Sequence, residues 1–227
     1  MNAAHRTRKV DVRLYALVDP ERAGGHDLAE LSWLVAAGGA TLVQLRDKHG
    51  DTRHMIDEAR AIRLNLAPMH VPLLINDRVD VALAAGADGV HVGQDDMPVE
   101  DARRLMGPDA IIGLSIKTLA QAEAARVDLI DYAAIGGVYV TMSKNNPDPP
   151  IGLEGLRRIA AIFRRRQPEL PLCAIAGIDL HNAGATVAAG VDGVAVISAL
   201  SLSQNPPDVA REMRAAIDKI IAGRGTP

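Results

Sequence analysis

Short apolar segments alternate with amphipathic segments from Leu14 almost to the end of the chain. The apolar segments have the length of buried strands, and the amphipathic ones carry apolar residues at the three- and four-residue spacing of helices. One such helical stripe consists of Met55, Ala59, Ile62 and Leu66. The pattern predicts strands at residues 14–18, 41–45, 73–75, 89–92, 111–114, 132–135, 172–175 and 193–196.

This order of elements is typical of an α/β protein. Alternating strands and helices form right-handed βαβ units, which build a parallel sheet. Eight parallel strands are the number that closes a (β/α)8 TIM barrel. The length of 227 residues is below the ~250–300 at which single cores divide into domains. We therefore predict one barrel domain over residues 13–222, with flexible tails at residues 1–12 and 223–227.

A weak internal repeat favours the closed barrel. The segment AAGADGVHVG at residues 84–93 is similar to AAGVDGVAVI at residues 188–197, and these precede the fourth and eighth predicted strands. A separation of four strands is what the duplication of a half-barrel would leave. An open, doubly wound sheet is the alternative arrangement of the same elements.

Composition limits the classes of partner. A net charge of −3 argues against general attraction to nucleic acid or to an anionic membrane. No apolar run approaches the ~20 residues of a membrane-spanning helix. The single cysteine, Cys173, lies in the apolar run LCAIA and is predicted to be a core thiol. One cysteine cannot form an internal disulfide, which fits a cytoplasmic location.

The histidines do not suggest a catalytic triad or a zinc site, since neither the residue order nor the ligand spacing is present. His91 alternates with Val90 and Val92 in a predicted strand, so its side chain faces either the barrel interior or the helices. A buried core histidine is the simpler interpretation.

The end of the second predicted strand carries the clearest chemical signal. Side chains alternate faces along a strand, so Gln44, Arg46 and Lys48 share one side. Leu42 precedes them on that side, so polar groups replace an apolar face towards the end of the strand. Cations beside a core cost several kcal/mol unless an anion meets them. This strand end therefore indicates a phosphorylated ligand.

Two carboxylates follow neighbouring strands of the predicted barrel. Asp77 comes after the third strand and Asp96 after the fourth. Mg²⁺ prefers one or two carboxylates together with water and phosphate oxygens, so the pair suggests a Mg²⁺–phosphate site. Asp77 could instead cap the following helix, and Asp95 competes with Asp96 as the ligand.

A second anion site is predicted after the last strands, where barrels of this type usually hold phosphate on backbone N–H groups. Gly177 follows the seventh strand and Ile197–Ser198 the eighth. Thr141, Ser143 and Lys144 add polar groups after the sixth strand. Alternatively, Gly177 is a plain turn residue and the polar loop a surface turn. Two anion sites at one mouth fit the joining of two phosphorylated substrates with loss of pyrophosphate.

At these positions the chain resembles the thiamine phosphate synthase family over about residues 14–221. No single motif is decisive, but their order and spacing are specific. The matching segments are QLRDK at 44–48, LIND at 74–77, GVHVGQDD at 89–96, IIGLS at 111–115, TMSK at 141–144, IGLEG at 151–155, AIAGI at 174–178 and VIS at 196–198.

The resemblance implies a transferase that condenses 4-amino-5-hydroxymethyl-2-methylpyrimidine diphosphate with hydroxyethylthiazole phosphate, or its carboxylated form. It implies Mg²⁺ on Asp77 and Asp96, and catalytic roles for Arg46, Lys48, Ser115 and Lys144. The implied ligands of the pyrimidine diphosphate are Gln44, Leu45, Arg46, Asp47, Lys48, Asn76, Ser115 and Lys144. The implied ligands of the thiazole phosphate are Thr141, Met142, Ser143, Gly177, Ile197 and Ser198.

Two alternatives share the predicted fold. A thiazole tautomerase would bind related compounds without condensing them, and its relatives tend to lose the diphosphate and metal residues. A non-catalytic phosphate-binding barrel would bind ligand without turnover. In each case the expected partners are small phosphorylated molecules, and the sequence leaves room for a homo-oligomer.

Overall fold

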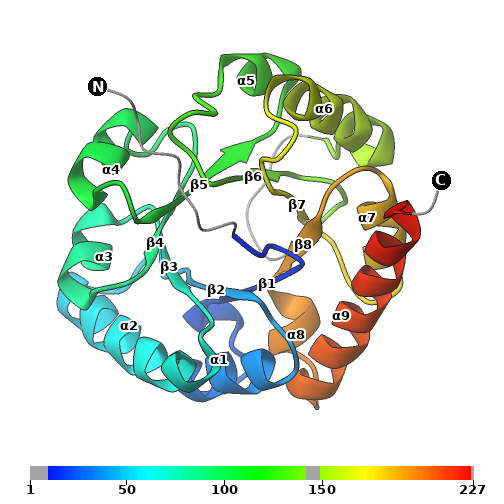
Figure 1. Cartoon of the computed structure of the whole chain (residues 1–227). Helices are drawn as coiled ribbons and strands as arrows, with labels where there is room; N and C mark the ends of the chain where they lie inside the picture. Colours follow the sequence, from blue (N-terminus) through cyan, green and yellow to red (C-terminus); the bar gives the residue numbers. More distant parts are fainter. Residues whose placement is uncertain (1–9, 142–148, 226–227) are drawn as a thin grey trace.

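The computed structural model describes residues 10–141 and 149–225, which form a closed barrel of parallel strands (Figure 1). Strands neighbour one another in sequence order, and β8 pairs with β1 to close the sheet. The predicted (β/α)8 barrel is confirmed, and the open-sheet alternative is wrong. The strands are β1 Leu14–Val18, β2 Leu42–Leu45, β3 Leu73–Asn76, β4 Gly89–Val92, β5 Ile111–Ile116, β6 Tyr132–Ile135, β7 Leu172–Ile175 and β8 Gly193–Val196.

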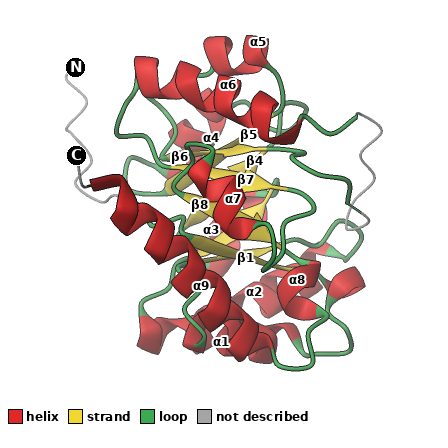
Figure 2. Ribbon diagram, turned by 90° about the vertical axis from the view of Figure 1, so that its right-hand side faces the viewer, coloured by secondary structure: helices red, strands yellow, loops and turns green. Residues whose placement is uncertain are grey.

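Helices surround the strands, as the side view shows (Figure 2). They are α1 Leu28–Ala37, α2 Thr52–Leu66, α3 Val79–Ala85, α4 Val99–Met106, α5 Leu119–Ala124, α6 Gly152–Arg166, α7 Ala183–Ala188, α8 Ser198–Ser201 and α9 Pro206–Ala222, with 3-10 turns η1 Pro20–Arg22, η2 Ala67–Met69 and η3 Gly223–Gly225. α9 begins at Pro206, because proline fits the first helical turn, where its missing N–H costs nothing.

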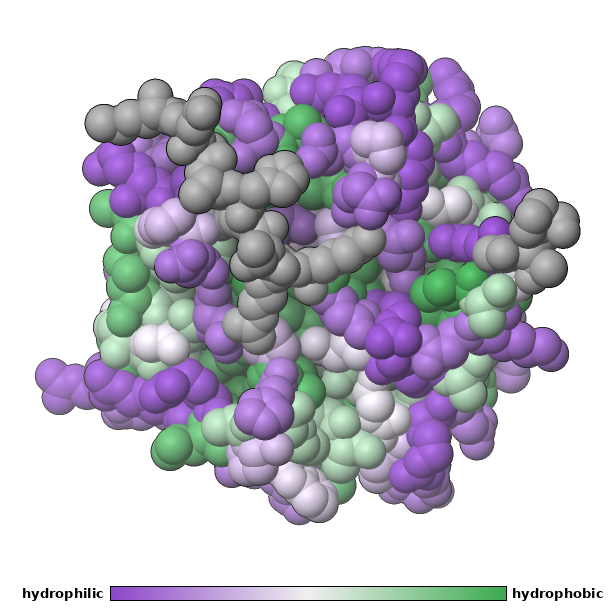
Figure 3. Space-filling model, viewed as in Figure 1, coloured by the Kyte–Doolittle hydropathy of each residue, from purple (hydrophilic) through white to green (hydrophobic). Residues whose placement is uncertain are grey.

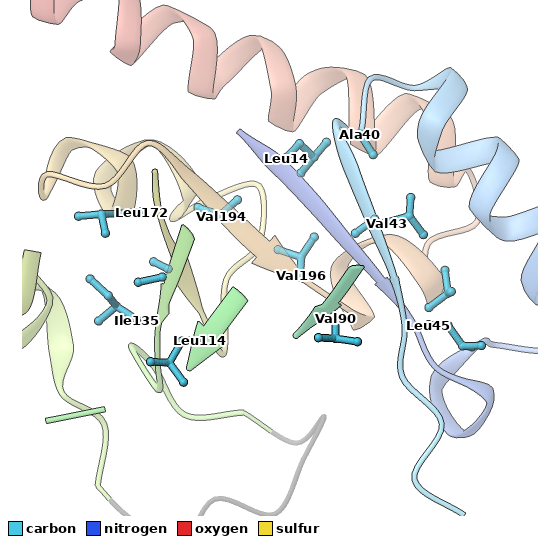
Figure 4. Close-up of a cluster of buried hydrophobic side chains, with 14 of the residues drawn as sticks. Leu14, Ala40, Val43, Leu45, Val90, Leu114, Ile135, Leu172, Val194 and Val196 are labelled. Atoms are coloured by element: carbon cyan, nitrogen blue, oxygen red, sulfur yellow. The ribbon is translucent and has the colours of Figure 1, made fainter. Parts of the chain in front are cut away.

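The two faces of each strand serve different cores. Outward side chains such as Val43 and Leu45 pack against the helices in one large apolar cluster (Figure 4). Inward side chains such as Leu42 and Tyr132 fill the barrel in a second cluster. Gly113 is required inside the barrel, since a Cβ at that position would overlap the Tyr132 ring.

A repeated hydrogen bond explains part of the sequence repeat. The aspartate before an even-numbered strand accepts a backbone N–H at or next to the start of the preceding strand. These bonds are Leu73 to Asp88 at 2.9 Å, Ile112 to Asp131 at 2.7 Å and Leu172 to Asp192 at 2.8 Å. Each joins two strands at the end of the barrel opposite the carboxyl ends, and so ties one pair of βα units together.

On the face shown in Figure 3, hydrophilic residues are interspersed with smaller hydrophobic areas. Trp33, Leu64, Leu83 and Leu105 are among the exposed apolar residues. Within the described part of the chain, no helix combines the length and the apolar character needed to cross a bilayer.

Candidate active site

The ends of β2 and β3 bring a cation and a carboxylate into contact. Lys48 Nζ donates to Asp77 Oδ2, and Asn76 Nδ2 donates to the same oxygen at 2.8 Å. The Lys48 side chain is 41% exposed and the Asp77 side chain 18%. The ammonium group is therefore accessible to an anion from solvent, while the carboxylate is held beneath it.

Asp77 has an unusual backbone conformation. Its φ is +59°, in the left-handed region, which costs a non-glycine residue about 1 kcal/mol or more. The N-cap of α3 is Arg78, and no side chain caps the helix. The interpretation of Asp77 as a helix cap is therefore wrong. Backbone strain of this kind gathers at functional sites, where the surrounding structure holds it.

Asp96, from the loop after β4, interacts with Asp77. Asp96 Oδ2 accepts the backbone N–H of Gly93 at 2.8 Å. Asp96 is half-buried whereas Asp95 is exposed, which favours Asp96 as the functional carboxylate. Burial and then the Asp96 carboxyl raise the pKa of Asp77, against the opposing effect of Lys48. Burial and a neighbouring carboxyl both disfavour the ionised form of Asp77, which is the form that would bind a cation.

This donor set fits Mg²⁺. Mg²⁺ takes one or two carboxylates and completes its shell with water and phosphate oxygens, and Asp77 and Asp96 supply the two carboxylates. Over residues 10–141 and 149–225, no group of three or more His, Cys, Asp or Glu side chains is placed to hold a metal. A pair of carboxylates suits a cation that also binds water and the phosphate oxygens of a ligand.

Arg46 pairs with a residue that the sequence analysis missed. Arg46 Nη1 donates to Asp19 Oδ2, and the two side chains are 14% and 2% exposed. The other oxygen, Asp19 Oδ1, accepts the Glu21 N–H at 2.9 Å and caps η1. The available signal was position, since Asp19 stands directly after β1, where βα units carry their functional residues.

A chain of hydrogen bonds runs through the barrel interior below the rim. Ser115 Oγ bonds His91 Nε2, and His91 Nδ1 bonds Tyr132 Oη, each at 2.8 Å. Tyr132 Oη bonds Tyr15 Oη at 2.8 Å, and Gln44 Nε2 donates to Tyr15 Oη. Burial raises the pKa of both tyrosines, so they remain neutral hydrogen-bonding groups. His91 thus faces the interior and links two of the predicted ligands, Ser115 and Gln44.

One atom of the Gln44 amide has no partner among residues 10–141 and 149–225. Its Oε1 is buried and accepts no hydrogen bond from that part of the chain. A buried polar atom without a partner costs about 1–3 kcal/mol. An amino group on a ligand at the barrel mouth would satisfy this oxygen, which is consistent with the predicted role of Gln44.

Two predicted ligands place their side chains elsewhere. Leu45 packs in the outer cluster against the helices, so only its backbone can face the mouth. Asp47 Oδ1 accepts the N–H groups of His49 and Gly50 at 3.0 and 2.7 Å, and so shapes the loop after β2. The predicted ligands Met142, Ser143 and Lys144 lie outside the described residues.

A cavity of about 480 Å³ lies at the carboxyl ends of β7 and β8. Its lining includes four predicted ligands of the thiazole phosphate, namely Thr141, Gly177, Ile197 and Ser198. These residues come from three different βα units. The fold therefore joins them in one space, as predicted, and the chain adds Arg22 to the lining.

The family model described as thiamine monophosphate synthase matches residues 14–200. The chain belongs to the thiamine monophosphate synthase family. It is 53% identical to the thiamine-phosphate synthase of Agrobacterium fabrum, over 95% of this chain and 98% of that one. It is 44% identical to the thiamine-phosphate synthase of Albidiferax ferrireducens, over 96% of this chain and 97% of that one.

A solved structure of the same kind supports the comparison. The thiamine phosphate pyrophosphorylase from Pyrococcus furiosus superposes with a TM-score of 0.81 and 34% identity, covering 94% of this chain and 98% of that one. The resemblance to the thiamine phosphate synthase family is confirmed. The ligand roles of individual residues stay predictions.

Gly177 packs closely against the backbone at the wall of the cavity. Its φ is +66°, and an added Cβ would overlap the Val140 carbonyl oxygen and lie 2.7 Å from Tyr139 Cβ. We expect Gly177→Ala to lower the free energy of unfolding by about 2 kcal/mol or more, through backbone strain and overlap together. Urea unfolding measures this change.

Gly86→Ala is the matched control for Gly177→Ala. The φ of Gly86 is +68°, but the nearest atom to an added Cβ is 3.9 Å away. This variant should show the backbone strain alone, about 1 kcal/mol. If the two variants lost the same free energy of unfolding, the close contacts at Gly177 would contribute nothing beyond the backbone strain.

Proposed function

We propose that the chain condenses 4-amino-5-hydroxymethyl-2-methylpyrimidine diphosphate with hydroxyethylthiazole phosphate, giving thiamine phosphate and pyrophosphate. The observation that supports the proposal is that two unlike sets of residues lie at the same end of the barrel, where all the parallel strands end. One is the Asp77–Asp96 pair with Lys48, and the other is the cavity lined by Gly177 and Ser198.

The first site would bind the diphosphate. When bound, Mg²⁺ on Asp77 and Asp96 would neutralise charge on the departing pyrophosphate. Lys48 would exchange its contact with Asp77 for a phosphate oxygen, and Arg46 would present its remaining N–H donors from its pair with Asp19. Such donors lower the barrier most when they stabilise charge that grows as the bond breaks.

The reaction then requires little acid–base chemistry from the protein. The C–O bond to the diphosphate breaks, and its electron pair leaves with pyrophosphate. The electron-rich aminopyrimidine delocalises the methylene cation, and Gln44 Oε1 would accept a hydrogen bond from the ring amino group. The lone pair of the thiazole nitrogen forms the new C–N bond, so neither a protein nucleophile nor a strong base is needed.

The second site would hold the nucleophile in place. A phosphate in the cavity near Gly177 and Ser198 fixes the thiazole ring against the pyrimidine. Holding two reactants in line replaces an encounter in solution and supplies several kcal/mol of the barrier. It also lets the thiazole capture the cation before water does. Lys144 is expected to assist the leaving group.

A pyrophosphate-release assay tests the proposal. With both substrates and Mg²⁺, we expect pyrophosphate and thiamine phosphate in equal amounts. Omission of either substrate should abolish thiamine phosphate formation, and chelation of Mg²⁺ should lower the rate at least 100-fold, because the metal would stabilise the departing pyrophosphate. Folded protein that makes no thiamine phosphate with saturating substrates would refute the proposal. Isomerisation of the thiazole instead would favour the tautomerase alternative.

Three further features remain part of the prediction. The cytoplasmic location, the assembly into a homo-oligomer and the preference between plain and carboxylated thiazole phosphate are expectations from the sequence. A kinetic comparison of the two thiazole phosphates would decide the last of these.

A further inference from the structure

Arg22 lines the cavity that would hold the thiazole phosphate, although it lies near the start of the chain and the other lining residues come from its second half. The cavity is built mainly from segments after β6, β7 and β8. Arg22 ends η1, the 3-10 turn that follows β1. Closure of the barrel between β8 and β1 brings the two segments together.

The turn that carries Arg22 is held at both ends. Pro20 opens η1, Asp19 caps it through the Glu21 N–H, and the Arg22 N–H donates to the Asp19 carbonyl at 2.9 Å. After the turn, Gly24 approaches α8 so closely that an added Cβ would lie 2.8 Å from the Ser201 carbonyl oxygen. The fold therefore fixes the backbone that positions Arg22 beside the cavity.

The charge on the cavity wall comes from this arginine. Among the described residues that line the cavity, Arg22 is the basic side chain and Asp179 the acidic one. Asp179 is exposed, and its Oδ1 accepts the N–H groups of His181 and Asn182 at 2.9 and 3.3 Å. The Asp179 carboxylate thus accepts hydrogen bonds from the backbone of the turn that follows it, whereas Arg22 is half-buried at the cavity wall.

A phosphate monoester carries about −1.5 to −2 charges near neutral pH. Neutral backbone N–H groups can orient it, but enclosing such an anion without a counter-charge is costly. A guanidinium group supplies the charge together with a planar fork of donors that matches two phosphate oxygens. The position of Arg22 suits this task.

We propose that Arg22 binds the phosphate group of the thiazole substrate and makes the site select the phosphorylated thiazole over the free alcohol. This inference rests on the proposed condensation. It adds a side chain that neither the sequence pattern nor the family resemblance indicated, and it assigns the discrimination between two ligands that differ by one phosphate group.

The test is calorimetric titration of hydroxyethylthiazole phosphate and of hydroxyethylthiazole into the wild-type protein, Arg22→Met and Arg22→Lys. Loss of a hydrogen bond to a charged group should weaken binding of the phosphate ester by about 10- to 100-fold in Arg22→Met. Binding of the free alcohol should change less than twofold. Arg22→Lys should retain part of the preference, because it keeps the charge without the fork.

Steady-state kinetics give the second measurement. In Arg22→Met the KM for the thiazole phosphate should rise, while the KM for the pyrimidine diphosphate stays unchanged. Arg104→Met is the matched control, since Arg104 is an exposed arginine on α4 paired with Asp101. It removes the same charge and should leave all constants unchanged.

The outcomes separate the two proposals. If the wild-type protein makes no thiamine phosphate, the condensation is refuted. If the wild type is active but Arg22→Met binds the phosphate ester normally, or weakens both ligands equally, the role of Arg22 is refuted. If Arg22→Met does not fold, the test uses Arg22→Lys and the same measurement, the ratio of its affinities for the phosphate ester and the free alcohol. A ratio equal to that of the wild-type protein would refute the role of Arg22.

Discussion

Asp77→Asn is expected to lower turnover by about 100-fold or more without lowering the melting temperature of the ligand-free protein. Turnover falls because one of two proposed Mg²⁺ ligands loses its charge. Stability does not fall because the pKa of Asp77 is raised in the fold, chiefly by burial and by Asp96. Ionised Asp77 is therefore unfavourable near neutral pH, and stability returns as the pH falls through its raised pKa. Asparagine also tolerates the left-handed backbone.

Melting with and without Mg²⁺ checks this prediction. In the presence of pyrophosphate, Mg²⁺ should raise the melting temperature of the wild-type protein, because a ligand of the folded state stabilises it, and should have little effect on Asp77→Asn. Asp80→Asn is the control. Arg78 lowers the pKa of Asp80 through a hydrogen bond at the surface, so this variant should lose at most a little stability and keep full turnover. An Asp77→Asn protein that retains the Mg²⁺ effect would mean the metal site is elsewhere.

Asp19→Ala is expected to damage both substrate sites at once. Its carboxylate holds Arg46 with one oxygen and caps η1, which carries Arg22, with the other. Removing one partner of a buried ion pair costs about 3–5 kcal/mol, since the other charge is left buried. We therefore expect a loss of about 3 kcal/mol in unfolding free energy and a higher KM for both substrates.

Urea unfolding and kinetics at several concentrations of each substrate measure the effects of Asp19→Ala. Asp101→Ala removes the partner of Arg104 from an exposed pair, and such pairs contribute about 0–1 kcal/mol. The control should therefore be nearly neutral. If Asp19→Ala raised the KM of neither substrate, the carboxylate would be a structural residue alone.

Much of the barrel could be predicted because its signals are local. Each βα unit is recognisable in the sequence as a short apolar run followed by apolar residues at helical spacing. The observed bounds of β1, β4 and β8 agree with those predicted from this pattern. The carboxylates Asp77 and Asp96 were found by one rule, since the carboxyl ends of parallel strands meet at one face. That rule needs no knowledge of distant contacts.

The parts that escaped prediction depend on contacts between distant segments. The Arg46–Asp19 pair joins residues that directly follow two neighbouring strands. The sequence around either residue does not indicate which residue it contacts. The inward direction of His91 follows from its bonds to Tyr132 and Ser115 on other strands. The alternation of side chains along a strand shows which residues share a face, but it does not show which face points into the barrel. Both faces of this sheet are buried, one in the barrel interior and one under the helices, so both carry apolar residues.

The pairing of Lys48 with Asp77 has a consequence for selectivity if both residues bind the diphosphate as proposed. A free anion that binds Lys48 alone would leave the Asp77 carboxylate beside Asp96 with the neutral Asn76 amide in place of the ammonium group. A metal-chelated diphosphate would supply a replacement, because its phosphate oxygens would accept from Lys48 while Asp77 and Asp96 would hold the metal. We therefore expect free phosphate to compete poorly with a metal-chelated diphosphate for this end of the barrel.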